Sequence, residues 1–269
     1  MTGSMMKRLR KLTGRALPGL CLVVALAGAC VPGPMQEDET EGPAGGGAKP
    51  AAAMPPIDAS APADTETATF AMGCFWGPDS LFGSLEGVVR TRVGYAGGTT
   101  ANPTYHNLGD HTETVQMDYD PAVISYEELL EAFWDNHNPA APSWSRQYMS
   151  LLFYHNEEQR GLAAASKERR EAELGRTVLT QLVPFSRFYL AENYHQKYRL
   201  RQEEELMAEF DAFYAEAQGF IDSTAAARIN GYLAGYGTFR ALQEHLISFG
   251  LSPQGEAQLL DIGRRILPG

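Results

Sequence analysis

The stretch FAMGCFWGPDSLFG, residues 70–83, changes from a strand pattern to a helix pattern within a few positions. The apolar run stops at Gly73, and a proline in the first turn with a glycine stop predicts a helix over residues 78–87. Cys74 lies between the expected strand and the expected helix, where unpaired backbone N–H groups and the helix dipole stabilise a thiolate. The alternative is a small buried hydrophobic residue, the usual role of a lone cysteine.

Outward from this stretch, strand and helix patterns mix without a regular βαβ order. The expected strands are 67–72, 88–98, 113–121, 149–156 and 177–192, and the expected helices are 78–87, 125–137 with Ser125 as its cap, and 156–175. From Tyr194 onward the pattern is mainly helical. We therefore expect an α+β fold with helices packed on a mixed β-sheet, in a ferredoxin-like two-layer sandwich, plus an extra helical C-terminal extension.

The amino-terminal residues have the pattern of an export signal followed by a linker. Residues 1–29 carry five basic and no acidic residues and include an apolar run, as in a signal peptide. Small residues precede Cys30, as in a bacterial lipobox, although they also suit ordinary signal cleavage. Residues 30–66 are rich in Pro, Gly, Ala and acid, which predicts a disordered tether. A tether directly after a cysteine favours lipidation of Cys30, and thus an exported, membrane-anchored protein of the bacterial cell envelope.

Charge excludes one class of partner. The 269 residues include 22 basic and 33 acidic side chains, a net charge of −11. A polyanion would be repelled, so we expect no nucleic-acid partner.

A family resemblance is carried by seven blocks in order: GCFWG, GYAGG, NPTYHNLGDHTETV, YDP, WDNHNP, RQYMS and YHQKY. They resemble the class A peptide-methionine sulfoxide reductases, which reduce the S epimer of methionine sulfoxide. The resemblance covers residues 67–214 as a catalytic domain and leaves 215–269 as the helical extension. It implies an oxidoreductase without a cofactor that repairs oxidised proteins or the free amino acid. Its reductant would be an external thiol, either thioredoxin-like or a small molecule.

The resemblance also implies roles for single residues. Cys74 would be the nucleophile, which attacks the sulfoxide sulfur and becomes a sulfenic acid. Glu113 would protonate the oxygen, which requires a pKa raised by partial burial. The other implied site residues are Tyr105 and Tyr148, which would hold the oxygen, and Phe75, Trp76 and Tyr198, which would surround the substrate methyl group. Without the resemblance, Glu113 would be a solvated strand residue and the tyrosines would be half-buried packing.

Two departures from the family pattern limit these expectations. Ser143 stands where many members have an aspartate, so the contact of that aspartate is not carried over. No cysteine follows Cys74 in the sequence, so reduction of the sulfenic acid must come from outside. The stripe of apolar residues in the extension predicts a cover packed on the domain.

Histidines in the matching blocks are expected to be structural. We expect His111 and His195 to make structural hydrogen bonds. His106 and His111 have a spacing that zinc sites sometimes use, but no close cysteine pair accompanies them, so no metal site is predicted.

Two other functions compete with the enzyme. A thiol-based peroxide sensor would use the same sulfenic acid without turning over methionine sulfoxide, but the aromatic neighbours of Cys74 argue against it. A catalytically inactive envelope lipoprotein would keep the fold as a scaffold. The joint presence of Cys74, Glu113 and the tyrosines argues against this inactive scaffold.

Overall fold

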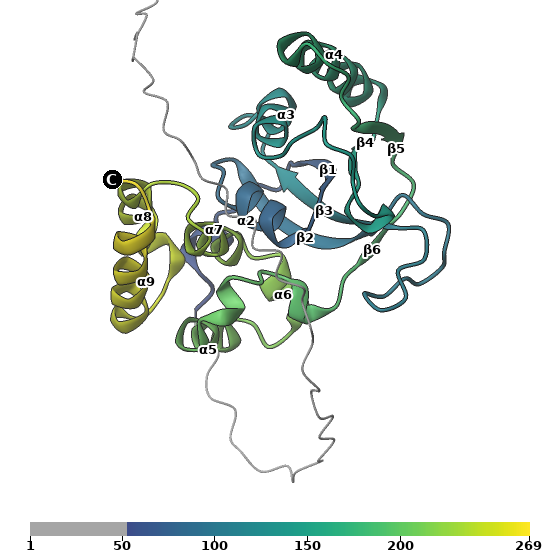
Figure 1. The fold of residues 1–269 in the computed structure, drawn as a ribbon. Helices are drawn as coiled ribbons and strands as arrows, with labels where there is room; N and C mark the ends of the chain where they lie inside the picture. The colour runs from purple at the N-terminus through teal and green to yellow at the C-terminus, as the bar shows by residue number, and fades with distance from the viewer. Residues whose placement is uncertain (1–52) are drawn as a thin grey trace, which may run out of the picture. The chain divides into compact units, whose positions relative to one another are not determined.

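The computed structural model describes residues 53–269, in which helices surround one β-sheet (Figure 1). The strands are β1 (Glu66–Met72), β2 (Val88–Ala96), β3 (Thr112–Tyr119), β4 (Ser150–Tyr154), β5 (Gln181–Pro184) and β6 (Phe188–Leu190). The helices are α1 (Pro56–Ala59), α2 (Trp76–Gly83), α3 (Tyr126–Asp135), α4 (Glu157–Leu174), α5 (Glu204–Phe213), α6 (Ala217–Ile221), α7 (Thr224–Leu233), α8 (Phe239–His245) and α9 (Pro253–Ile266). The 3-10 helices are η1 (Arg146–Tyr148), η2 (Asn193–His195), η3 (Leu200–Gln202) and η4 (Leu246–Phe249).

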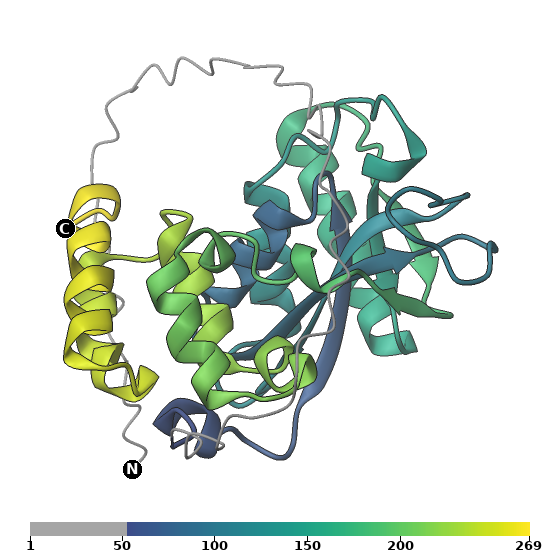
Figure 2. The same cartoon turned by 90° about the horizontal axis from the view of Figure 1, so that it is seen from below.

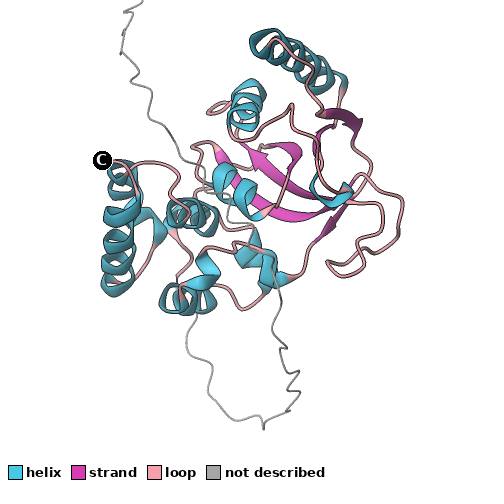
Figure 3. Ribbon diagram, viewed as in Figure 1, coloured by secondary structure: helices cyan, strands magenta, loops and turns pink. Residues whose placement is uncertain are grey.

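The six strands form a mixed sheet, in the order β5-β4-β1-β3-β2-β6. Neighbouring strands are antiparallel except for β4 and β5, which are parallel. The predicted α+β class with a mixed sheet is confirmed. Figure 3 shows the strands in magenta with helices beside them.

The sheet is curled, because its two edge strands are joined by a short link. Only residues 185–187 separate β5 from β6, and they can span about 15 Å. The edges of a flat six-stranded sheet would lie about 24 Å apart. The single strand predicted over residues 177–192 is therefore wrong. Pro184 ends the first half, and the chain crosses to the other edge before it pairs again.

Helices α2 and α3 bury one face of the sheet. The ring of Phe70 in β1 lies 5.5 Å from that of Phe82 in α2 and 5.4 Å from that of Phe133 in α3. Ser125 caps α3 through a capping box, as its sequence predicts. Helix α2 begins two residues before the predicted start, and its first turn tolerates the proline, which needs no N–H partner there.

The carboxyl-terminal helices share a second hydrophobic core. Its buried members come from both sides of the predicted boundary at residue 214, and include Leu206 and Phe210 of α5 as well as Ile229, Tyr232, Leu242 and Leu259. Figure 2 shows these helices, green to yellow, as a group. Helix α7 packs closely on α2, since a Cβ at Gly83 would lie 2.5 Å from the Ala227 carbonyl oxygen. The extension therefore continues the fold that α5 begins.

The predicted tether is corrected at its end. Residues 56–59 form α1, and the Asp58 carboxylate accepts bonds from the Ala225 amide (3.0 Å), the Ser223 hydroxyl (2.7 Å) and the Tyr214 hydroxyl. These partners lie more than 150 residues away, so local composition did not reveal them. The predicted signal peptide and Cys30 lie outside the described residues. Within residues 53–269, no helix is long and apolar enough to cross a membrane.

Replacing Asp58 tests whether α1 belongs to the folded unit. We expect Asp58→Ala to lower the free energy of unfolding by about 2 kcal/mol, because three donors lose a charged acceptor. Urea unfolding measures the change, with exposed Asp64→Ala as the matched control. Equal stability of the two variants would contradict the role of α1.

Candidate active site

Cys74 lies at the junction of β1 and α2, and its side chain is exposed. Gly73 before it has φ +98°, a conformation that side chains rarely adopt. No atom lies within 4 Å of a Cβ built there, so backbone conformation rather than space requires the glycine. The turn directs the chain from the strand into the helix, and Cys74 stands just before the helical N–H groups. This position favours a thiolate.

Glu113 is the second residue of β3 and is 1% exposed. Its Oε2 accepts from the Phe75 amide at 3.0 Å, and its Oε1 accepts from Gln147 Nε2 at 2.7 Å. Burial raises the pKa of the Glu113 carboxyl, and the two hydrogen bonds only partly oppose it. The Glu113 carboxyl therefore keeps its proton to higher pH than an exposed glutamate does. Its partner Phe75 directly follows Cys74 in the sequence.

Two tyrosines lie next to this pair. Burial raises the pKa of the Tyr148 hydroxyl. The effect is increased by the charges of Glu113 and Cys74 and by Tyr105, with which Tyr148 forms a hydrogen bond. Tyr148 thus remains a hydrogen-bond donor at neutral pH. The four residues that sequence assigned to oxygen chemistry therefore come together in the structure.

The three residues predicted to surround the substrate methyl group divide into two kinds. Trp76 and Tyr198 are stacked, with ring centroids 3.7 Å apart and planes at 5°. Phe75 is 1% exposed and packs against Tyr95 and His195, so it supports the site from below. Trp76, rather than Phe75, is therefore accessible to a ligand.

His195 and His111 make the structural hydrogen bonds that the sequence predicts. His195 Nδ1 accepts from Trp76 Nε1 at 3.2 Å, and burial lowers the pKa of His195 to about 4, so the ring is neutral. His111 Nδ1 accepts from the Gly98 amide at 3.2 Å. Within the described part of the chain, no group of three or more His, Cys, Asp or Glu side chains could hold a metal ion.

A cavity of about 840 Å³ opens beside the thiol. Its lining includes Cys74, Ser143, Trp144, Tyr148 and Met149. The Ser143 hydroxyl, at the position of the family aspartate, donates to the Ser145 carbonyl at 2.7 Å. It therefore braces its own loop.

Comparison with known proteins decides the family. A family model described as peptide methionine sulfoxide reductase matches residues 66–223. The chain belongs to this family. It is 46% identical over 189 residues to the peptide methionine sulfoxide reductase of Drosophila melanogaster, covering 70% of this chain and 76% of that one. It is 41% identical over 221 residues to peptide methionine sulfoxide reductase A5 of Oryza sativa subsp. japonica, covering 80% and 82%. It is 46% identical over 144 residues to MsrA of Methanosarcina acetivorans, covering 49% and 77%.

The chain is thus a class A reductase, an oxidoreductase that reduces methionine sulfoxide. The family-model match ends inside the loop before α7, so α7–α9 lie beyond it.

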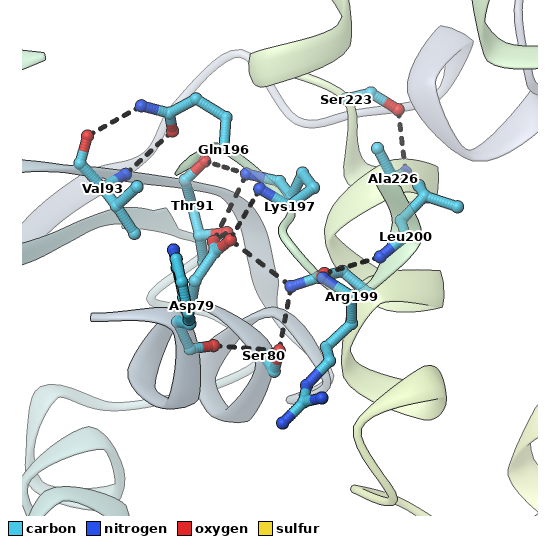
Figure 4. A network of polar contacts seen from close by, with 12 residues as sticks. Asp79, Ser80, Thr91, Val93, Gln196, Lys197, Arg199, Leu200, Ser223 and Ala226 are labelled. Carbon is cyan, nitrogen blue, oxygen red and sulfur yellow. Dashed lines mark hydrogen bonds and ion pairs between the residues drawn. The ribbon is translucent and has the colours of Figure 1, made fainter. Parts of the chain in front are cut away.

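A buried ion pair behind the reductase site holds α2 against the Tyr198 segment (Figure 4). Asp79 of α2 and Lys197 are both 0% exposed, and Lys197 Nζ lies 3.4 Å from Asp79 Oδ1. The Lys197 amide also donates to Asp79 Oδ2 at 2.9 Å, and Nζ donates to the Thr91 carbonyl at 2.5 Å. The pair therefore helps to fix Trp76, which precedes Asp79 on α2, and Tyr198, which follows Lys197.

Asn230 of α7 completes the network. Its Nδ2 donates to Asp79 Oδ2 at 3.3 Å and to Ser80 Oγ at 3.0 Å. Its Oδ1 accepts from the amides of Arg199 and Leu200 at 2.9 and 3.1 Å. A residue beyond the family-model match therefore binds both α2 and the segment that follows Tyr198.

The sequence did not predict the residues that make hydrogen bonds to the site residues and keep them in position. Gln147 donates to Glu113 and directly precedes Tyr148 in the RQY block. This position in the block was the sequence feature that could have indicated the role of Gln147. Glu192 accepts from the Tyr105 amide at 3.0 Å and from the Tyr95 hydroxyl at 2.7 Å. No local pattern indicated this role.

A double-mutant cycle tests the ion pair. Lys197→Met leaves Asp79 buried without its cation, and we expect a loss of about 3–5 kcal/mol in the free energy of unfolding. Asp79→Asn alone should also destabilise. The double variant should lose less than the sum, because no charge remains unpaired. Urea unfolding of the four proteins measures this, and additive losses would show that the two charges do not interact.

Proposed function

We propose that this reductase acts on the S epimer of methionine sulfoxide through the Cys74 thiolate, with Glu113 as the proton donor. The observation that carries the proposal is the buried Glu113 carboxyl, bonded to the amide next to Cys74. A protonated carboxyl at this place can deliver a proton to an oxygen bound at the thiol.

The chemistry balances with these two groups. Cys74 Sγ forms a bond to the sulfoxide sulfur, and the oxygen takes the Glu113 proton. The oxygen then moves to Sγ. Its bond to the methionine sulfur and the Sγ–S bond of the intermediate both break, and methionine is released. The methionine sulfur gains two electrons, and Cys74 loses two and becomes a sulfenic acid. Glu113 is left as a carboxylate and takes up a proton from solvent before the next turnover.

The tyrosines and the stacked rings orient the substrate. Tyr148 and Tyr105 lie beside Glu113 and donate hydrogen bonds to the oxygen as it gains charge. The Trp76–Tyr198 pair offers an apolar wall to the methyl group. An epimer with oxygen and methyl exchanged would place its oxygen against this wall, which accounts for selection of one epimer.

Recycling uses an external thiol. One thiol of the reductant attacks the sulfenic sulfur, which releases water and leaves a mixed disulfide on Cys74. A second thiol then frees Cys74 as a thiol. A thioredoxin-like protein supplies both thiols, as do two molecules of a small-molecule thiol. The exposure of Cys74 supports access by either reductant.

The location proposed is the bacterial cell envelope, with oxidised exported proteins as substrates. Its support is the sequence of residues 1–30, with a basic stretch, an apolar stretch and small residues before Cys30. Lipidation at Cys30 would anchor the protein to a membrane and make that sulfur a thioether that cannot attack Cys74.

The ferredoxin-like two-layer sandwich stays a prediction for the core of the fold. The antiparallel order β4-β1-β3-β2, with α2 and α3 on one face, supports it.

Glu113→Gln tests the proton donor. We expect formation of methionine to slow by about two to four orders of magnitude, since an amide cannot donate a proton as an acid. In the native reductase the rate should fall as pH rises through the raised pKa of Glu113, because the carboxylate form has no proton to give. This fall should vanish in the variant. Single-turnover formation of methionine across neutral pH measures both, with Cys74→Ser as the inactive control. A variant with the native rate and pH profile would assign the proton to another group.

Mass spectrometry tests the state of Cys30. The protein is isolated from a bacterial membrane and treated with one equivalent of methionine sulfoxide. We expect an acylated amino-terminal peptide beginning at Cys30 and a trappable sulfenic acid on Cys74. A disulfide between Cys30 and Cys74, without a lipid, would overturn both the anchor and the need for an external first thiol.

A further inference from the structure

The cavity beside Cys74 is larger than one methionine sulfoxide side chain requires. The five heavy atoms of that side chain occupy roughly 150 Å³ at the volume share of a water molecule. The cavity has about 840 Å³. Most of it is therefore available to other parts of a substrate.

The aromatic residues near the thiol lie outside this cavity. Trp76 and Tyr198 are in direct stacking contact, and Phe75 is buried beneath them. None of these three is among the residues that line the cavity. Since Cys74 itself lines the cavity, the cavity has room for the polypeptide attached to a bound methionine sulfoxide.

Part of the cavity lining is apolar and includes an exposed tryptophan. We call it the Trp144 wall, and it consists of Ala141, Pro142, Trp144, Met149 and Leu179. The Trp144 side chain is 82% exposed, and its ring lies 4.8 Å from that of Tyr148. Exposed aromatic groups of this kind are characteristic anchors for binding partners. No carboxylate is among the described residues that line this cavity.

The loop that carries Trp144 is held in place at its base. Arg146 Nη2 donates to the Gly97 carbonyl at 2.9 Å, and its Nε donates to the Asp110 carbonyl at 3.0 Å. The Ser143 bond to the Ser145 carbonyl braces the residues on either side of Trp144. Little conformational freedom remains to be lost on binding, which favours affinity.

We propose that the Trp144 wall binds apolar residues next to the oxidised methionine in an extended polypeptide. Trp144 thereby sets a preference for peptide substrates with apolar flanking residues over free methionine sulfoxide. Such flanks are exposed to solvent in unfolded chains and gain from burial against the wall. This specificity rests on the function proposed for Cys74.

Trp144→Ala in the full chain tests the proposal. The substrates are free methionine sulfoxide and two blocked peptides, with methionine sulfoxide flanked either by leucine and phenylalanine or by glycine. Dithiothreitol is the reductant, so protein docking does not contribute. We expect the preference for the apolar peptide over the free substrate, as a ratio of kcat/KM, to fall about tenfold through KM. Trp144→Phe should retain most of it. Ile247→Ala, which removes an apolar side chain that is 81% exposed in η4, is the matched control.

Each other outcome overturns the proposal. An equal loss for free and peptide substrates would mean that Trp144 supports Tyr148 rather than a peptide. An equal loss for both peptides would exclude recognition of apolar flanks. A loss only when thioredoxin replaces dithiothreitol would assign the wall to the reductant. Calorimetry measures binding of the two peptides to Cys74→Ser, with and without Trp144→Ala. Because this variant does not turn over substrate, a failure of peptide recognition can be distinguished from a failure of the proposed chemistry.

Discussion

The buried contact between Asp79 and Lys197 is the constraint on which the catalytic site depends. A carboxylate without exposure to water requires several partners, and Asp79 finds them on β2, on the segment at Lys197 and on α7. Separation of any of these would leave a buried charge poorly paired, at a cost of several kcal/mol. The helix that follows Cys74 and the segment that carries Tyr198 are therefore kept in one arrangement by buried polar contacts.

Glu113 shows how the site balances two needs. Burial favours its protonated form, while the donors from Phe75 and Gln147 favour the carboxylate that results from proton transfer. A carboxyl with burial alone would keep its proton too firmly, and one with the donors alone would lose it too early. The two donors are neighbours of Cys74 and Tyr148 in sequence, so the groups that react and these donors share the same short segments.

Local pattern was sufficient where structure depends on near neighbours. The strand patterns of β1–β4, the cap at Ser125 and the helix patterns of α3 and α4 required no distant partner, and the motif blocks located Cys74 and Glu113. It failed where the outcome depends on long-range contacts. The curl that divides residues 177–192 between two edges, and the folding of α1 through Asp58, each depend on partners far along the chain. The contacts of Asn230 and Glu192 with the site residues are also distant in sequence.

The position of α1 also gives the reductase a front and a back. Ile57 and Ser60 of this region lie beside Gly87 and Asp120, at the end of the sheet where β1 begins. Cys74 follows the other end of β1, seven residues and about 23 Å further along. The chain thus enters the fold on the side away from the thiol. If that entering segment is fixed to a surface, Cys74 lies at the far end of β1 from the point where the chain enters the fold.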